Sequence, residues 1–482
     1  MRLLARLLEP RAVAHAHSAV PGGIHDSAQA RSGAESLKAI DEKYQQDADP
    51  EFRTRALIDR RAVPTLVTVR APERTPDRPC VDCLDHPVVT ERTRPAVRGR
   101  VAFWVAALIL SITMLGTTLP TPLYVIYQAQ WHFSAAIVTV TFAVYAVAVL
   151  VTLLLAGRSS DQAGRKPVLA AALGASALST IVFIVAPNVG VLFAGRILSG
   201  LSAGLMTGTA TAALTELVPA SASRRASLVA TAANMGGLGL GPLIAGLFAQ
   251  YAPQPTVLVF EVYLAVLAAA GLGLLLVPET VSPRRRPVLR FAGLGIPEQG
   301  RSEFIAAGAG GFAAFSLLGL FAALAPTFLG NVLHENSHAV QGGVVFLLLA
   351  AGTLTQLALA RFSSRRVVMT GLGLFLAALG LIVAALAQAD MALFLAGTVV
   401  GGMAVGAVFL GSLATANRLA PPGQRGQVIS AFFVACYTGL IIPVVGVGVA
   451  TEFISDFAAV LALSILLAGL CLFSLARIRN GR

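Results

Sequence analysis

Long apolar stretches separated by short polar segments run from residue 101 almost to the end of the chain. A helix needs about 20 mostly apolar residues to cross the hydrocarbon core of a bilayer. Stretches of that length cover 101–127, 134–156, 167–187, 190–218, 227–250, 256–277, 303–330, 339–361, 366–388, 391–418, 427–450 and 454–476. The pattern therefore predicts an all-α membrane protein with twelve transmembrane helices.

The twelve spans form two sets of six that resemble each other. Residues 224–246 parallel 425–447, with Pro242 opposite Pro443. Parallel repeats of this kind predict two six-helix bundles related by a pseudo-twofold axis along the membrane normal, with a binding site between them. The boundaries we expect are 99–278 for the first bundle, 279–302 for a cytoplasmic linker, 303–476 for the second bundle and 477–482 for a cytoplasmic tail.

Composition and charge placement agree with a membrane protein. The chain is 56% hydrophobic and 12% charged, whereas soluble domains carry about 25% charged residues. The net charge of +12 alone would suggest nucleic-acid binding. After residue 100, however, every Lys and Arg except Arg196 falls in connections on one side of the predicted spans. Because basic residues mark the cytoplasmic side, we expect a multi-pass protein of the inner (plasma) membrane with both termini cytoplasmic, and no nucleic-acid partner.

Residues 1–98 differ from the rest, because they are polar and lack sustained periodicity. We expect either a disordered cytoplasmic segment or an over-extended gene model whose true start is a valine such as Val97. Cys80 and Cys83, with His86 nearby, resemble half of a zinc site. One CxxC without a second pair does not predict a metal site, so we expect neither a metal nor a cofactor.

The connection between spans 2 and 3 reads GRSSDQAGRKP. It carries a GxxxDxxGR[KR] pattern at Gly157, Asp161, Gly164, Arg165 and Lys166. With this pattern at this point in twelve spans, the chain resembles the major facilitator superfamily of secondary transporters. The resemblance covers residues from roughly 100 to 476 and implies transport of small-molecule substrates by alternating access.

The resemblance implies that this connection is a conformational latch. Gly157 has no side chain, so the end of span 2 is expected to approach a neighbouring helix closely. Asp161 is expected to face the start of span 11, near Gln427, because a helix N-terminus carries partial positive charge. Arg165 and Lys166 are expected to pair with Asp161 or with lipid phosphates.

Arg196 lies within span 4, where a charged side chain is costly and usually marks a functional site or an ion pair. The resemblance implies a role for Arg196 in proton coupling. A purely structural ion pair is the alternative. In either case Glu261, at a similar depth in span 6, is the expected partner.

Span 5 fits a gxxxGPxxxG form at Gly237, Gly241, Pro242 and Gly246. This form resembles the proton-antiporter branch of the family, which exports drugs and metabolites. Ordinary glycine-rich helix packing is the alternative, because glycine is frequent in membrane helices.

The resemblance implies that spans 1, 4, 7 and 10 line the substrate cavity. The lining residues we expect are Thr121, Tyr124, Thr207, Thr211, Phe321 and Thr327. Span 1 has no acidic residue at mid-membrane, and a cavity without fixed charge favours neutral or cationic lipophilic substrates over anions.

The resemblance therefore implies a proton-coupled antiporter that exports small, neutral or lipophilic compounds, and we expect a monomer in contact with membrane lipid. A metabolite symporter of the same fold and a transport-inactive sensor or scaffold are the alternatives. Enzyme activity is not expected, because the sequence contains no HExxH, GxSxG or P-loop pattern.

Overall fold

The computed structural model describes residues 96–157, 159–281, 291, 293–421 and 423–480. The expectations for residues 1–98, including the CxxC, fall almost entirely outside this part of the chain. The long helices are α4 (Ala96–Thr118), α6 (Ala135–Ala156), α8 (Arg165–Ile184), α9 (Val189–Glu216), α10 (Ser223–Tyr251), α11 (Pro255–Leu274), α12 (Arg301–Asn331), α13 (His338–Leu359), α14 (Ser364–Gln388), α15 (Met391–Leu419), α16 (Arg425–Ala450) and α17 (Asp456–Asn480). Twelve helices of the described residues are long and apolar enough to cross a membrane, which confirms the predicted spans.

The first span differs from its prediction. It is one helix, α4, that ends at Thr118, followed by a short helix α5 (Tyr124–Trp131). Pro120 and Pro122 lie in the break between them. Proline cannot donate a backbone hydrogen bond and clashes with the preceding turn, so the apolar run continues while the helix does not.

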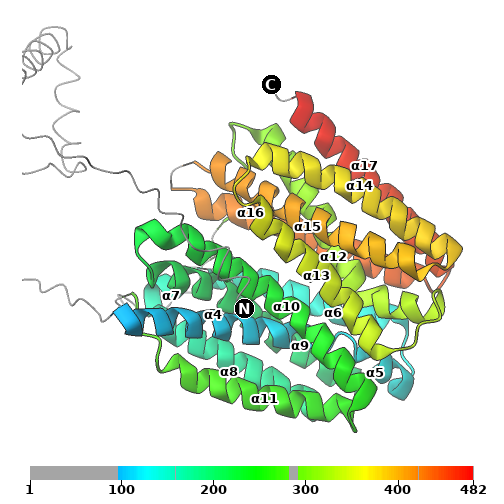
Figure 1. The fold of residues 1–482 in the computed structure, drawn as a ribbon, viewed down its shortest axis with the longest axis horizontal. Helices are drawn as coiled ribbons and strands as arrows, with labels where there is room; N and C mark the ends of the chain where they lie inside the picture. The colour runs from blue at the N-terminus through cyan, green and yellow to red at the C-terminus, as the bar shows by residue number, and fades with distance from the viewer. Residues whose placement is uncertain (1–95, 158, 282–290, 292, 422, 481–482) are drawn as a thin grey trace, which may run out of the picture. The chain divides into compact units, whose positions relative to one another are not determined.

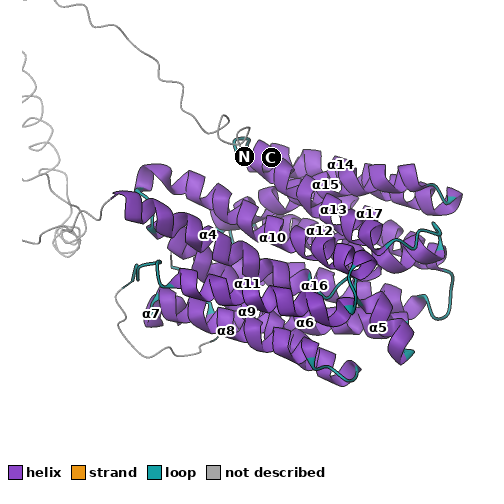
Figure 2. Ribbon diagram, turned by 60° about the horizontal axis from the view of Figure 1, so that its bottom comes forward, coloured by secondary structure: helices purple, strands orange, loops and turns teal. Residues whose placement is uncertain are grey.

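The helices form two bundles, α4 to α11 and α12 to α17 (Figures 1 and 2). The bundles meet along two pairs of helices, α10 with α13 and α6 with α16. In span order these pairs are 5 with 8 and 11 with 2, so exchanging the two halves converts one pair into the other. This pairing is what a pseudo-twofold axis between the bundles requires.

Each half contains a helix, α10 or α16, in which an internal proline leaves a backbone carbonyl without its usual donor, and a hydroxyl from another helix donates to that carbonyl. Pro242 in α10 cannot donate to the carbonyl of Leu238 one turn earlier. The hydroxyl of Thr118, at the end of α4, donates to that oxygen at 2.7 Å. A buried carbonyl that would otherwise lack a partner is thereby satisfied.

The second half repeats this arrangement. Pro443 in α16 frees the carbonyl of Gly439, and the hydroxyl of Ser316 in α12 donates to it at 2.9 Å. Thus a hydroxyl of span 1 donates to the carbonyl freed by the proline of span 5, and a hydroxyl of span 7 does the same for span 11. The internal repeat extends to single hydrogen bonds.

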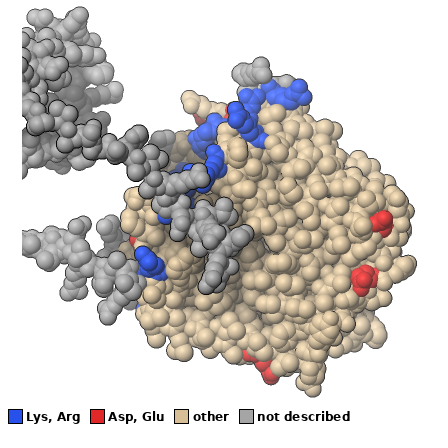
Figure 3. Space-filling model, in the orientation of Figure 1, with Lys and Arg blue, Asp and Glu red and all other residues tan. Residues whose placement is uncertain are grey.

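Charge is distributed unevenly along the helix axes. On the face drawn in Figure 3, basic side chains gather toward the end where α17 finishes, and the opposite end carries acidic side chains and no basic ones. The helix bounds give the same result for the described residues, since all Lys and Arg except Arg196 lie at or near helix ends on one side: Arg98, Arg100, Arg165, Lys166, Arg224, Arg225, Arg301, Arg361, Arg365, Arg366, Arg418, Arg425, Arg477 and Arg479. We call this side the basic end and the other side the outer end.

Candidate functional site

The connection between α6 and α8 folds tightly at the basic end. A short helix α7 (Ser159–Ala163) follows α6, and Gly164 leads directly into α8. Gly164 has φ +98°, a conformation that residues with a Cβ rarely adopt. A Cβ at this position would also lie 2.6 Å from a carboxylate oxygen of Glu279. Both the backbone conformation and the close approach of Glu279 explain the glycine.

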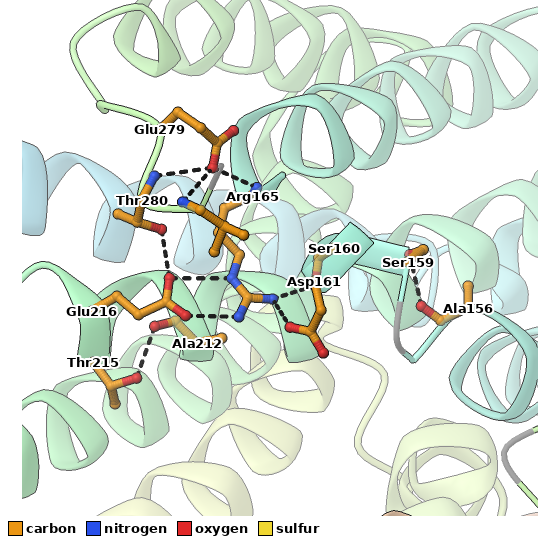
Figure 4. A network of polar contacts seen from close by, with 11 residues as sticks. Ala156, Ser159, Ser160, Asp161, Arg165, Ala212, Thr215, Glu216, Glu279 and Thr280 are labelled. Carbon is orange, nitrogen blue, oxygen red and sulfur yellow. Dashed lines mark hydrogen bonds and ion pairs between the residues drawn. The ribbon is translucent and has the colours of Figure 1, made fainter. Parts of the chain in front are cut away.

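Arg165, the first residue of α8, is the centre of a network of charged groups (Figure 4). Its Nη1 lies 2.6 Å from Asp161 Oδ1 and donates to the hydroxyl of Ser160. Its Nη2 and Nε donate to the two carboxylate oxygens of Glu216 at 2.7 and 3.2 Å. Paired hydrogen bonds of this kind are among the stronger polar contacts in proteins, so Arg165 joins α7, α8 and the end of α9.

Glu279, which follows α11, caps the start of α8. Its carboxylate accepts hydrogen bonds from the backbone N–H groups of Arg165 and Lys166 at 2.8 and 2.9 Å, and also from those of Thr280 and Val281. Burial alone would raise the pKa of the Glu279 carboxyl, but these four N–H groups bring the pKa below its ordinary value. An anion does sit at a helix N-terminus here, but the anion is Glu279 and the helix is α8.

The expected contact between Asp161 and the start of α16 is not formed in this structure. The Asp161 side chain pairs with Arg165 and is 59% exposed. The start of α16 instead meets the linker, where the N–H of Gly295 donates to the carbonyl of Gln427 at 3.2 Å. The reason given for Gly157 is also wrong here, because a Cβ on Gly157 would meet only the carbonyl of Leu153 in its own helix.

Lys166 likewise differs from its predicted role. Its Nζ donates to the carbonyl of Leu275, at the end of α11, at 3.2 Å. Lys166 and Glu279 therefore both connect the start of α8 to the end of α11. The charged connection joins helices within the first bundle.

Arg196 is fully buried in the outer half of α9. Its Nη1 donates to the carbonyl of Thr117 at 2.7 Å. The guanidinium carbon lies 4.5 Å from the ring centroid of Tyr145 and 5.8 Å from those of Tyr124 and Phe142. These three rings stabilise the cation through their electron-rich faces.

The expected pair of Arg196 with Glu261 is not formed. Glu261 is exposed on α11, and the ion pairs among the described residues include neither side chain. Helical phase explains the error, because both residues lie in uniformly apolar helices whose buried face the sequence does not mark.

The glycines of the proline-containing helix α10 allow two close helix contacts. A Cβ on Gly237 or Gly241 would collide with backbone oxygens of Ser111 and Leu115 in α4. A Cβ on Gly246 would collide with the carbonyl of His338 at the start of α13. The motif therefore lets α10 pack against α4 within its bundle and against α13 across the interface.

The two bundles meet at the outer end through equivalent contacts. Gly246 of α10 lies against Gly342 of α13, and Gly448 of α16 lies against Thr139 of α6. These contacts occupy corresponding places in the two halves. The bundles are therefore in close contact at the outer end.

The residues expected to line the cavity are divided between buried and half-buried positions. Thr121, Tyr124 and Phe321 are buried, and Phe321 stacks on Phe394 with ring centroids 5.7 Å apart. Thr207, Thr211 and Thr327 are half-buried. None of the six lines the small apolar pocket that the structure shows between α10, α12, α13 and α15, whose walls include Met235, Phe315, Leu348, Gln356, Val405 and Phe409.

Comparison with known proteins gives the family. The model of the Major Facilitator Superfamily matches residues 106–444, which is well over half of the chain. The chain belongs to the Major Facilitator Superfamily. The symmetric bundles and the charged connection after the second span are therefore those of a transporter of this superfamily.

Solved structures of superfamily members have the same fold. The human organic anion transporter MFSD10 (TETRAN) is 19% identical, with a TM-score of 0.59, covering 80% of this chain and 100% of that one. A bacterial homologue of the human lysosomal transporter Spinster, in an inward-facing and unoccupied conformation, is 14% identical with a TM-score of 0.61. That match covers 79% of this chain and 97% of the homologue.

Two curated relatives match shorter segments. Superoxide dismutase [Ni] of Streptomyces coelicolor is 46% identical over 56 residues, which is 12% of this chain and 43% of the enzyme. Multidrug resistance protein 2 of Bacillus subtilis is 27% identical over 140 residues, which is 29% of this chain and 35% of that protein. The chain thus spans less than half the length of the curated relatives it matches.

Proposed function

We propose that this superfamily member exports small lipophilic molecules from the cytoplasm in exchange for protons, by alternating access of the space between its bundles. The paired glycine contacts at the outer end are the observation that carries this proposal. Two symmetric pairs of helices that meet through glycine suit a closure that forms and breaks as the bundles rock. The similarity to a multidrug resistance protein supports export.

We assign the basic end to the cytoplasmic side of the plasma membrane, because Lys and Arg are enriched in the cytoplasmic connections of membrane proteins. The outer end then faces away from the cytoplasm, and the structure corresponds to a state closed on that side. The absence of a contact from Asp161 to α16 in the described residues supports this assignment, since the latch is proposed to form in the opposite state. Asp161→Asn is expected to reduce transport while leaving expression intact, and unchanged transport would remove the latch role.

The glycine-rich face of α10 supports antiport over the symport alternative. Gly237, Gly241, Pro242 and Gly246 place α10 against both α4 and α13, so α10 links the interior of one bundle to the interface. Because Arg196 and Glu261 do not pair in the described residues, and because a guanidinium does not release its proton, we propose that Arg196 influences coupling only through its fixed positive charge.

The test has two stages. A deletion strain and an overexpressing strain are first compared for susceptibility to, and accumulation of, a broad panel of compounds. A compound for which the two strains differ in susceptibility or accumulation is then added to everted membrane vesicles whose lumen has been acidified by respiration. An antiporter releases protons from the lumen when the compound is added, a symporter does not, and an inactive scaffold gives no difference between the strains at the first stage.

We propose that the similarity to the nickel enzyme belongs to the polar segment before the spans. Outside residues 106–444, only residues 1–105 are long enough to contain 56 matched residues. The segment would then be a fused or adjoining piece of a different protein class, and less than half of the enzyme is represented in it. Sequencing the N-terminus of the native protein decides between a fusion, which begins before residue 97, and a start at Val97.

A further inference from the structure

Arg196 is a buried cation that forms no ion pair with any carboxylate of the described residues. Its one hydrogen bond goes to the uncharged carbonyl of Thr117. Its Nε and Nη2 have no hydrogen-bond partner among the described residues. A guanidinium buried without a counter-charge is costly, so an arginine kept at this depth marks a functional site whose opposite charge is supplied from elsewhere.

The carboxylates of the described helices do not supply that charge. Glu216 pairs with Arg165, and Glu303 pairs with Arg418 at 2.6 Å. Glu261 is exposed on α11. The aromatic rings around Arg196 stabilise the cation but leave its charge unbalanced.

Three hydroxyl groups near the break in the first span are also buried, with no hydrogen-bond partner in the part of the chain that the structure describes. They are those of Thr121, Tyr124 and Tyr127, and each of these side chains is at most 3% exposed. The ring centroid of Tyr124 lies 5.8 Å from the guanidinium carbon of Arg196, and Tyr127 follows three residues later on the same short helix, α5. Unpaired buried hydroxyls are costly, and each of them can donate a hydrogen bond to an anion.

We propose that Arg196, Tyr124 and Tyr127 form the recognition site for a carboxylate on the transported molecule, whose class is therefore that of lipophilic organic acids. The guanidinium would offer Nε and Nη2 to the two carboxylate oxygens, the geometry for which arginine is best suited. The aromatic surroundings would cover the apolar remainder of the molecule. The proposal rests on the transport function proposed above and replaces the expectation of a cavity without fixed charge.

Binding can be measured with a reporter already present. The chain has two tryptophans, and Trp131 stacks on Tyr127 with ring centroids 4.9 Å apart. In a Trp104→Phe background, purified protein in nanodiscs is titrated with 4-phenylbutyrate, decanoate and 1-naphthylacetate, and with the amide of each acid. Trp131 emission and the thermal unfolding temperature are both recorded. At least one acid is expected to give saturable changes in both, and its amide to bind at least about tenfold more weakly, since it lacks the charge.

The variants separate recognition from folding. Arg196→Gln is expected to abolish the preference for the acid over its amide, and Arg196→Lys to keep part of it. Tyr127→Phe removes only a hydroxyl and is expected to weaken binding of the acid by about threefold. Arg361→Gln is the matched control, because Arg361 is an exposed arginine at the basic end, and it is expected to bind as the parent does.

The outcomes are distinguishable from failure of the transport function. Equal affinity for acids and amides, a response of the parent that Arg196→Gln leaves unchanged, no response to any of the acids, or a response to sodium chloride alone would each overturn the carboxylate site. If amides are exported in the vesicle assay and acids are not, the transport function is supported and the carboxylate site is rejected. If acids bind through Arg196 but no compound is transported, the carboxylate site is supported and the transport function is rejected.

Discussion

The hydrogen bond from Thr118 to Leu238 is expected to matter only because residue 242 is proline. In Thr118→Val the side chain keeps its shape but loses the hydroxyl that donates at 2.7 Å. The Leu238 carbonyl is then left without a donor, because Pro242 has no backbone N–H to donate to it. An unsatisfied buried acceptor costs about 1–3 kcal/mol in soluble proteins, and side-chain hydrogen bonds between membrane helices average about 0.6 kcal/mol. We therefore expect a loss of about 1 kcal/mol in the free energy of unfolding.

Pro242→Ala supplies the test of this reasoning. Alanine at position 242 restores a backbone N–H that can donate to Leu238, so the Thr118 hydroxyl becomes redundant. Thr118→Val should then cost close to nothing, and the double-mutant cycle should give a coupling of about 1 kcal/mol. A coupling of this size corresponds to a change of roughly fivefold in the unfolding equilibrium constant.

Reversible unfolding in mixed micelles of lauryl maltoside and sodium dodecyl sulfate, followed by circular dichroism, gives the four free energies. Thr113→Val is the matched control, because the Thr113 hydroxyl donates at 2.8 Å to the carbonyl of Ile109 in its own helix. That carbonyl keeps its ordinary backbone donor, so no coupling to position 242 is expected. If Thr118→Val costs the same in the parent as in the Pro242→Ala background, the reasoning is refuted.

Three further predictions concern the charged connection and the outer closure. Gly164→Ala should lower the free energy of unfolding by about 1–2 kcal/mol, because the alanine would be forced into a left-handed conformation; thermal unfolding measures the loss, and an unchanged transition temperature would contradict it. Glu279→Gln should reduce stability at neutral pH but not in acid: the folded-state pKa of Glu279 is depressed, so its contribution is present above the ordinary value of about 4.3 and is lost as the pH falls through the folded-state value. Parent and variant unfolding curves should therefore converge only below the depressed folded-state pKa of Glu279, and a difference that persists there would contradict the role of the ionised carboxylate. Gly342→Ala should open the outer end, because a Cβ there would collide with the carbonyl of Pro242; His338→Cys, at the same end, should then be alkylated faster from outside, and an unchanged rate would argue against closure at this contact.

The sequence was sufficient for the spans because their signal is local. Length and hydropathy mark each helix, and the predicted and observed bounds agree within a few residues for eleven of the twelve spans. The first span was extended too far because Pro120 and Pro122 interrupt the helix without interrupting the apolar run. The positions of the two prolines in the sequence were therefore the signal that the helix ends before residue 120.

The charged site was less predictable, because its contacts join residues far apart in the chain. Arg165 was expected to pair with Asp161, four residues away, and does so. Its other partners, Glu216 and Glu279, are 51 and 114 residues distant. The signal for Glu279 was its position in the Pro-Glu-Thr sequence directly after the sixth span, on the side where α8 begins. Sequence spacing alone does not show that the two helix ends meet.

Transport by purified protein in proteoliposomes tests the central claim most directly. A compound identified in the susceptibility screen is supplied outside vesicles with an acidic lumen, and its uptake is followed with and without an ionophore that equalises the pH. A proton antiporter is predicted to accumulate the compound inside above its external concentration, and to lose that accumulation when the pH gradient is abolished. Uptake that is indifferent to the gradient, or that requires acid on the outside, would contradict the account.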